Sequence, residues 1–309
     1  MSKTTIKRFA FFTVLIALIF SSSSYIKNNT ITETKPLAKH VILIGVDGFG
    51  AYAVEKATIP NIRKMMDNGS YSLQARSVLP SSSAVNWASM LMGSGPELHG
   101  YTKWDSRTPE MPSRRLGKEG IYPTIFSLID EQLPKSKKGA IYTWGGIRNL
   151  FERELVDLDY NGETDTKTLD KATKFITKEK PIFTFIHLDD ADHKGHKIGF
   201  DSPEYYSEIE IIDALIGEMI AKLEDKNLMK DTVIILTSDH GGNKKSHGGN
   251  TLKEMEIPWI IYGKGISKQG KLESTIVTYD TGATIAYLLG LEIPEFWRGK
   301  AVKEILSNK

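Results

Sequence analysis

The sequence predicts an α/β fold with a mainly parallel central sheet and helices on both of its faces. Short, continuously apolar runs alternate with segments whose apolar residues recur at helical spacing, as in successive strand–helix units. A run that is apolar at every position is typical of a parallel strand covered on both sides. The chain has 309 residues, 40% hydrophobic and 25% charged, which suits one large domain and excludes a disordered or collagen-like protein.

The elements follow one another along the body of the chain. The apolar run at residues 41–46 predicts the first buried strand. Residues 203–225 predict a long helix, because Ile209, Ile212 and Ile216 fall on one face. On the same criteria we expect further strands at 73–79, 139–144, 181–188, 232–237 and 257–262, and helices at 60–68, after the serines at 81–83, and at 123–133, 164–178 and 280–289.

Residues 1–24 have the pattern of a secretory signal peptide. Lys3, Lys7 and Arg8 precede a mostly apolar stretch that is short for a membrane span and ends in serines. The alternative is an uncleaved N-terminal anchor. In either case we expect an exported protein, periplasmic or extracellular, with membrane contact only through this segment. Residues 25–38 predict a solvated linker, and residues 39–309 a single folded domain.

Composition excludes two classes of function. The formal net charge of +2 becomes −1 without Lys3, Lys7 and Arg8, so no basic nucleic-acid-binding surface is indicated. The sequence contains no cysteine, which excludes disulfides, thiol catalysis and a lipid-modified cysteine.

Two strands end in residues that could bind a metal ion. Asp47 follows the strand at 41–46, and Asp239 with His240 follows the strand at 232–237. His247 comes seven residues after His240, across a glycine-rich loop. Carboxylate and imidazole together suit Zn²⁺ or a similar divalent ion, although a capped turn would explain residues 238–241 equally well.

A third strand end carries the densest set of ionisable groups. Residues 189–196 contain three carboxylates and two imidazoles, including Asp192 and His196. These groups would repel one another or be heavily desolvated without a cation, and a solvated acidic loop is the alternative. Since the carboxyl ends of parallel strands meet at one edge of a sheet, we expect all these side chains to lie on loops at that edge. They suffice for two divalent sites.

A serine cluster precedes an apolar helical segment. Ser81, Ser82 and Ser83 follow Pro80, so one hydroxyl is expected at a helix N-terminus, where backbone N–H groups favour an anion. A plain helix cap is the alternative. His99 is expected to be structural. In the polar stretch 101–120 we expect a surface excursion beside the site, and Trp144 and Arg148 could line a substrate pocket by stacking and by pairing with an anion.

Taken together, these motifs resemble the alkaline phosphatase superfamily, and within it the nucleotide pyrophosphatase/phosphodiesterase type. The resemblance covers residues 39–306 and rests on the ordered series Asp-Gly, Pro-x-x-Ser-x-x-Asn, Asp-x-x-x-His, Ser-Asp-His-Gly and His-Gly-Gly. It implies an alkaline phosphatase-like fold and an exported hydrolase of small phosphate esters that uses two divalent metal ions, with Zn²⁺ the preferred ion.

The resemblance also implies roles for single residues. One ion would be held by Asp192, His196 and His247, and the other by Asp47, Asp239 and His240 together with the nucleophile Ser83. Asn86 would bind the phosphoryl group. Ser83 would attack phosphorus with help from its own ion, and the second ion would stabilise the leaving oxygen and then supply hydroxide to hydrolyse the phosphoserine.

Two departures keep alternatives open. Diesterases of this type usually carry Thr where this chain has Ser83, and the chain is short for the family. A phosphomonoesterase is therefore the main alternative, for which Arg148 or Lys194 could supply positive charge. A phosphomutase, a phosphonate hydrolase and an inactive metal-binding relative are further alternatives. A sulfatase is disfavoured because neither Pro nor Arg follows Ser83 in the sulfatase pattern.

Overall fold

The computed structural model describes residues 35–306. The expectations for residues 1–24 and for most of 25–38 lie outside this part of the chain. Leu37 and Ala38 both donate backbone N–H groups to Leu288 O, so residues expected in the linker already belong to the folded domain. Among the described helices, none combines the length and the apolar character needed to cross a bilayer.

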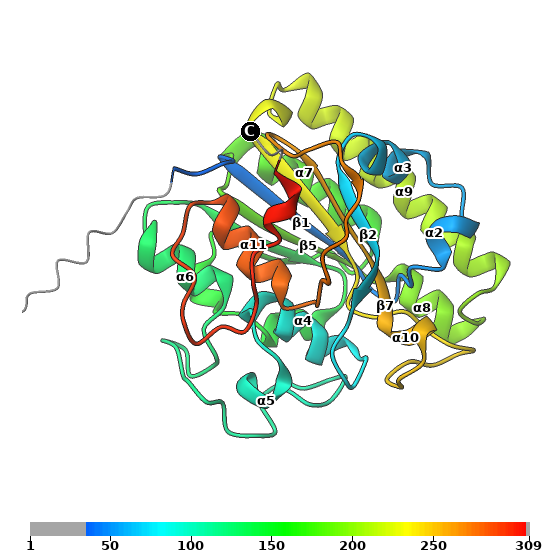
Figure 1. The fold of residues 1–309 in the computed structure, drawn as a ribbon, viewed down its shortest axis with the longest axis horizontal. Coiled ribbons are helices and arrows are strands. Elements are labelled where there is room, and N and C mark those ends of the chain that lie inside the picture. The colour runs from blue at the N-terminus through cyan, green and yellow to red at the C-terminus, as the bar shows by residue number, and fades with distance from the viewer. Residues whose placement is uncertain (1–34, 307–309) are drawn as a thin grey trace, which may run out of the picture. The chain divides into compact units, whose positions relative to one another are not determined.

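An eight-stranded sheet forms the centre of this domain, and the predicted α/β class is confirmed (Figure 1). The strand order is β4-β3-β5-β1-β6-β7-β2-β8. The five strands from β4 to β6 are mutually parallel, whereas β7 runs antiparallel to both β6 and β2. The bounds are β1 His40–Val46, β2 Ser70–Arg76, β3 Lys138–Tyr142, β4 Leu158–Asn161, β5 Phe183–Leu188, β6 Thr232–Thr237, β7 Glu256–Gly263 and β8 Gly270–Lys271.

Helices cover both faces of the sheet, and each face has its own apolar core. On one face, α4, α6 and α11 pack residues such as Trp87 and Phe126 against the sheet, and on the other α3, α7 and α9 pack residues such as Ile176 and Ile209 (Figure 1). The α-helices are α2 Ala53–Lys56, α3 Pro60–Asp67, α4 Ser83–Met92, α5 Pro96–His99, α6 Ile125–Gln132, α7 Asp165–Glu179, α8 Asp190–Lys197, α9 Pro203–Asp225, α10 Leu252–Met255 and α11 Asp280–Leu288.

The register of the central strands sets the position of the site. In β1, Val46 pairs with Leu188 of β5, and Gly45 pairs with Thr237 of β6. The residues that follow these three strands therefore emerge side by side at the carboxyl edge of the sheet. Gly48, just after β1, lets helix α8 lie close to the end of this strand. Its φ is +69°, and a Cβ there would lie 2.8 Å from Asp192 Oδ1 of α8. Only glycine allows β1 and α8 to approach this closely.

Candidate functional site

The predicted ligands gather at this edge, but on different elements from those expected. Asp47 follows β1, and Asp239 and His240 follow β6, as expected. Asp192 and His196 lie on helix α8, one turn apart, and Ser83 is the first residue of α4. The expectation that the ligands lie on loops is wrong for Asp192 and His196, because the chain turns directly into a helix after β5, whereas the serine cluster does lead into a helix N-terminus as expected.

The first ligand group surrounds His240. Its Nε2 lies 3.0 Å from Asp239 Oδ2, 3.4 Å from Asp47 Oδ1 and 3.2 Å from Ser83 Oγ. All four residues are buried. Asp47, Asp239 and His240 each offer one atom to a set that spans less than 4.8 Å, and this is the group that the resemblance assigned to the nucleophile's ion.

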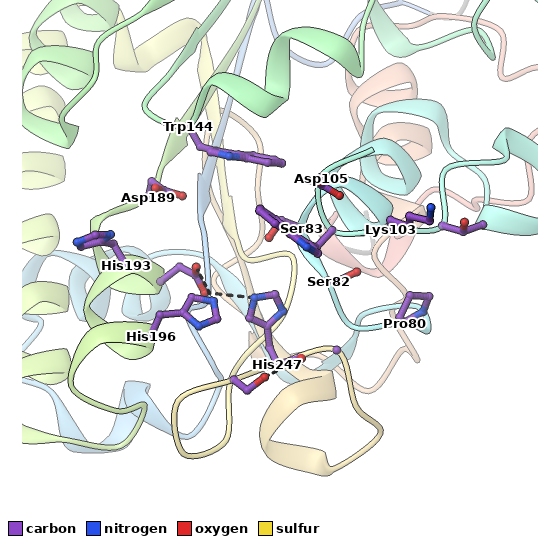
Figure 2. Close-up of a pocket in the computed structure, with 15 residues that line it drawn as sticks. Pro80, Ser82, Ser83, Lys103, Asp105, Trp144, Asp189, His193, His196 and His247 are labelled. Atoms are coloured by element: carbon purple, nitrogen blue, oxygen red, sulfur yellow. Dashed lines mark hydrogen bonds and ion pairs between the residues drawn. The ribbon is translucent and has the colours of Figure 1, made fainter. Parts of the chain in front are cut away.

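The second group surrounds Asp192. Its Oδ2 lies 3.3 Å from His196 Nε2, and its Oδ1 lies 3.9 Å from His247 Nε2. The rings of His196 and His247 have centroids 4.9 Å apart, are tilted by 58° and lie side by side in Figure 2. His240 stacks on His247 at 3.7 Å and also lies within reach of Asp192, so it stands between the two groups.

The three histidines share one hydrogen-bond pattern. Nδ1 of His196 lies 2.9 Å from Lys245 O, Nδ1 of His240 lies 2.9 Å from Gly241 O, and Nδ1 of His247 lies 3.1 Å from Ser81 O. A carbonyl oxygen only accepts, so each ring carries its proton on Nδ1 and turns a bare Nε2 toward the carboxylates. Metal-ligating histidines are oriented by such outer bonds.

The charges and unpaired atoms of the two ligand groups favour a bound cation. Asp47 Oδ1, Asp192 Oδ1 and Asp239 Oδ2 are buried carboxylate oxygens without a hydrogen-bond partner. Unprotonated Nε2 atoms of His240 and His196 lie 3.0 and 3.3 Å from carboxylate oxygens, where the lone pairs of the two atoms repel one another and a positive ion would relieve the repulsion. The residues present therefore fit one or two divalent ions with oxygen and imidazole ligands.

The pKa shifts have the same origin. Burial, followed by the charges of Asp47 and Asp192, raises the pKa of Asp239 well above its usual value. Burial and the charges of Asp47 and Asp189 do the same to the pKa of Asp192. Burial lowers the pKa of His240 to about 3. A divalent cation would reverse these effects on the carboxylates, because it favours their charged forms.

The serine cluster divides its three hydroxyl groups among different tasks. Ser81 Oγ donates to Gly249 O and accepts from Gly248 N, so it fixes the loop that carries His247. Ser82 Oγ is buried and has no hydrogen-bond partner. Only Ser83 Oγ bonds to His240, and because the proton of that ring is on Nδ1, the serine hydroxyl donates to Nε2. Ser83 is thus the serine hydroxyl that lies within a ligand group.

The side chain of Asn86 bonds to the 78–82 segment and does not reach the cleft. Its Oδ1 accepts from Val78 N at 2.7 Å, and its Nδ2 donates to Pro80 O and Ser82 O at 3.1 Å. The side chain is fully buried and does not line the cleft. The geometry therefore gives no support to the expected phosphoryl contact, and instead the amide shapes the 78–82 segment that places Ser83.

A cleft of about 710 Å³ opens beside the two groups (Figure 2). Trp144 borders it, as the sequence suggested, but Arg148 is exposed elsewhere and Lys194 pairs with Glu208. His99 is fully buried and bonds to Ser89 Oγ and Tyr101 N, consistent with a structural role. The residues that line the cleft are Pro80, Ser82, Ser83, Thr102, Lys103, Trp104, Asp105, Trp144, Asp189, Asp192, His193, His196, Ser246, His247 and Gly248.

Sequence reasoning missed several of these side chains. Trp104, 58% exposed, stacks near Trp144 with ring centroids 6.5 Å apart, and its carbonyl accepts from Ala84 N on helix α4. Lys103 and Trp104 belong to the excursion expected beside a site, but nothing in the sequence marked them within it. Asp189 and His187 lie within ligand distance of Asp47. Burial and then the charge of Asp47 raise the pKa of Asp189 to about 7.

Comparison with known proteins adds three relatives. Bis(5'-adenosyl)-triphosphatase ENPP4 of Pongo abelii is 24% identical over 241 residues, which cover 74% of this chain and 52% of that protein. This chain thus spans about half the length of that relative. Murine ectonucleotide pyrophosphatase/phosphodiesterase 5, in an inactive form in complex with AMP, has a TM-score of 0.69 at 19% identity, covering 87% of this chain and 100% of that one. Wild-type alkaline phosphatase PafA has a TM-score of 0.70 at 12% identity, covering 88% and 99%.

The two solved structures establish an alkaline phosphatase-like fold. A family model described as type I phosphodiesterase/nucleotide pyrophosphatase matches residues 41–256, most of the chain. This match includes every residue of both ligand groups. The chain therefore belongs to the type I phosphodiesterase/nucleotide pyrophosphatase family.

Proposed function

We propose that this chain is an exported, two-metal phosphodiesterase or nucleotide pyrophosphatase in which Ser83 is the nucleophile. The observation that carries the proposal is the position of Ser83 Oγ, 3.2 Å from His240 Nε2 and at the start of α4. A hydroxyl at a helix N-terminus, beside a group of carboxylate and imidazole ligands, is placed to attack a phosphoryl group.

Asp47, Asp239 and His240 would hold one ion, and Asp192, His196 and His247 the other, with Zn²⁺ favoured by the three imidazoles. When bound, such ions polarise the phosphoryl oxygens and lower the pKa of a serine hydroxyl or of water. The chain's own residues supply the rest. Ser83 Oγ lies 3.2 Å from His240 Nε2 and so stands beside this ligand group, and the α4 N-terminus turns its positive end toward the non-bridging oxygens. Ser81 keeps His247 in place.

The cleft favours a diester over a monoester. A monoester dianion needs extra positive charge, but Arg148 and Lys194, which could have supplied it, do not line the cleft. Among the residues that line the cleft, Lys103 is the one lysine or arginine, and the negative charges of Asp105 and Asp189 offset its positive charge. A singly charged phosphodiester suits this balance better, because the two carboxylates oppose a second negative charge on the substrate.

The tryptophans indicate what the ester carries. Trp104 and Trp144 lie 27° from parallel beside Ser83, and a flat ring gains about 1–3 kcal/mol from stacking on such a surface. We therefore propose a nucleotide or similar aromatic phosphate ester as the substrate. The AMP complex of the related murine protein supports the same class.

A rate comparison tests the proposal. The metal-reconstituted protein would be assayed on nitrophenyl phosphate, methyl nitrophenyl phosphate and a nitrophenyl ester of a nucleotide. We expect the nucleotide ester to be fastest, followed by the methyl diester. A preference for the monoester would replace the proposal with a phosphomonoesterase. Export rests on the N-terminal 24 residues, and cell fractionation with N-terminal sequencing of the mature protein would test it.

A further inference from the structure

The two carboxylate oxygens of Asp47 have different surroundings. Oδ2 accepts hydrogen bonds from Trp87 Nε1 at 2.9 Å and from His187 Nε2 at 3.0 Å. Oδ1 has no hydrogen-bond partner and turns toward His240, 3.4 Å away. One oxygen is therefore fully engaged with the protein interior, and the other faces the ligand group.

His187 differs from the three histidines of the ligand groups. Those rings donate Nδ1–H to carbonyl oxygens, whereas Nδ1 of His187 is buried without a partner. An unpaired, buried N–H costs more free energy than an unpaired acceptor, so the proton belongs on Nε2, where it bonds to Asp47. His187 is thus a donor to the carboxylate and lacks the outer bond that orients a metal-ligating ring.

The fold fixes both donors. Trp87 lies on α4 one turn after Ser83, so the two side chains share a helix face. Its indole occupies space left by Gly45 of β1, where a Cβ would come within 2.3 Å of the ring. His187 of β5 pairs with Gly45 in the sheet and contacts the indole edge at 5.0 Å. Trp87 and His187 are fully buried, so neither has freedom to turn away.

We propose that Trp87 and His187 are positioning residues that fix the orientation of Asp47 and reserve Oδ1 for a divalent ion. The inference rests on the proposed function, because it assumes that Asp47 binds a metal. It also links the nucleophile to its ion: the helix that begins at Ser83 holds, through Trp87, the carboxylate that binds the ion. Removal of such an outer partner lowers metal affinity about 10–100-fold in other metalloproteins.

One alternative uses the same atoms. Asp47, His187 and Asp189 could hold an ion of their own, since their atoms lie within 4.8 Å of one another. His187 would then carry its proton on Nδ1, buried and unpaired. The two readings differ in the number of ions bound, which is two per chain for the positioning role and three for the alternative.

Calorimetric titration of the metal-free full chain with Zn²⁺ tests the inference. We expect two ions per wild-type chain. Trp87→Phe and His187→Phe each remove a donor but keep an aromatic ring, and each should weaken one ion about tenfold or more while the other is unchanged. His187→Gln, which can place an N–H near the position of Nε2, should recover most of the affinity.

The matched control is Trp259→Phe. The indole of Trp259, in β7, is equally buried and donates to Thr281 Oγ1 of α11 at 3.1 Å, and not to a residue of either ligand group. The Trp259→Phe substitution should leave the affinities for both Zn²⁺ ions unchanged. Thermal melts of all variants exclude unfolding, and if Trp87→Phe fails to fold, the comparison of His187→Phe with His187→Gln decides.

Three results would overturn the inference. These are unchanged affinities in both Phe variants, equal weakening of both ions, or a third ion that disappears in His187→Phe. If the wild-type chain binds no ion, the proposed function fails as well. If it binds two ions that the variants do not affect, only the positioning role fails.

Discussion

Ser83 Oγ lies 3.2 Å from Nε2 of His240, whose Nδ1 is bound to the Gly241 carbonyl. The bond makes the serine a donor and fixes its oxygen within a group that contains two buried carboxylates.

Ser83→Ala should lower turnover of a nitrophenyl nucleotide ester at least a hundredfold, because loss of a nucleophile removes the covalent route. Metal content should not change. Ser82→Ala is the matched control: Ser82 also lines the cleft, but its buried hydroxyl has no hydrogen-bond partner. Equal losses in the two variants, measured as kcat/KM, would show that the wrong serine has been identified.

Asn86→Ala should destabilise the fold by about 1–3 kcal/mol, because it leaves the part-buried Val78 N–H without its partner and removes the bonds that the amide donates to Pro80 O and Ser82 O. Urea unfolding measures the change. The amide of Asn68 makes two exposed hydrogen bonds, to Lys64 O and from Lys268 Nζ, and provides the control Asn68→Ala, expected to change stability by less than about 1 kcal/mol. If Asn86→Ala unfolds like the wild type yet loses activity, the direct phosphoryl contact would regain support.

Trp104→Ala should raise KM for a nitrophenyl nucleotide ester about tenfold, since stacking on a base contributes about 1–3 kcal/mol. Trp104→Phe should recover most of the loss. The methyl nitrophenyl diester has no base and should be hydrolysed by all three proteins with similar KM. A similar effect on both substrates would mean that Trp104 shapes the cleft and does not recognise a ring.

Chelation should lower the melting temperature. The unpaired oxygens of Asp47, Asp192 and Asp239 are buried, and an ion at a thousand times its Kd would add about 4 kcal/mol to the free energy of unfolding. Differential scanning calorimetry with and without a chelator measures this, and the Ser83→Ala protein should show the same difference. A melting temperature that does not respond to Zn²⁺ would contradict the metal assignment.

Glu152→Gln tests a buried carboxyl group away from the site. Burial raises the pKa of Glu152 from 4.5 to about 7, although hydrogen bonds from Thr124 oppose the shift. Between these values the folded chain keeps a proton that the unfolded chain has lost. The free energy of unfolding therefore falls by about 3 kcal/mol as pH rises through this window, and is flat above it. Urea unfolding at pH 4 and pH 8 measures the effect. Because the variant lacks the titrating carboxyl group, its free energy of unfolding relative to that of the wild type should rise by about 3 kcal/mol between these two pH values. An identical pH profile would show that Glu152 is not shifted.

Much of the fold could be predicted because its strands are buried on both sides. Strands such as β1 and β6 are continuous apolar runs, and α9 repeats isoleucine at helical spacing. The type and the position of these elements could therefore be predicted from the sequence. β2 begins at Ser70, three residues before the predicted strand, because serine, tyrosine and glutamine alternate there without a clear apolar pattern. The short α8 could not be seen, since its ionisable residues serve the ligand groups and do not form an apolar face.

The parts of the site that could be predicted are those whose chemistry requires particular residue types. Asp192, His196 and His247 stood out as candidate ligands because metal-binding side chains are few in kind, and their assignment to one ion came from the family resemblance. The Trp104–Trp144 pair and the two donors to Asp47 could not, because an aromatic side chain in a sequence gives no sign of whether it packs, stacks on a ligand or donates one hydrogen bond. Those roles depend on Gly45, on sheet register and on the path of the 101–120 excursion.

Covalent trapping tests whether Ser83 is the nucleophile. The metal-reconstituted chain would be mixed with a nitrophenyl nucleotide ester, quenched in acid within the first turnover, digested and analysed by peptide mass spectrometry. We predict a nucleotidyl group on the peptide that contains residues 81–83, located on Ser83 by fragmentation and absent from the Ser83→Ala protein. Rapid release of nitrophenol with the label on another residue, or with no labelled peptide at all, would contradict the account.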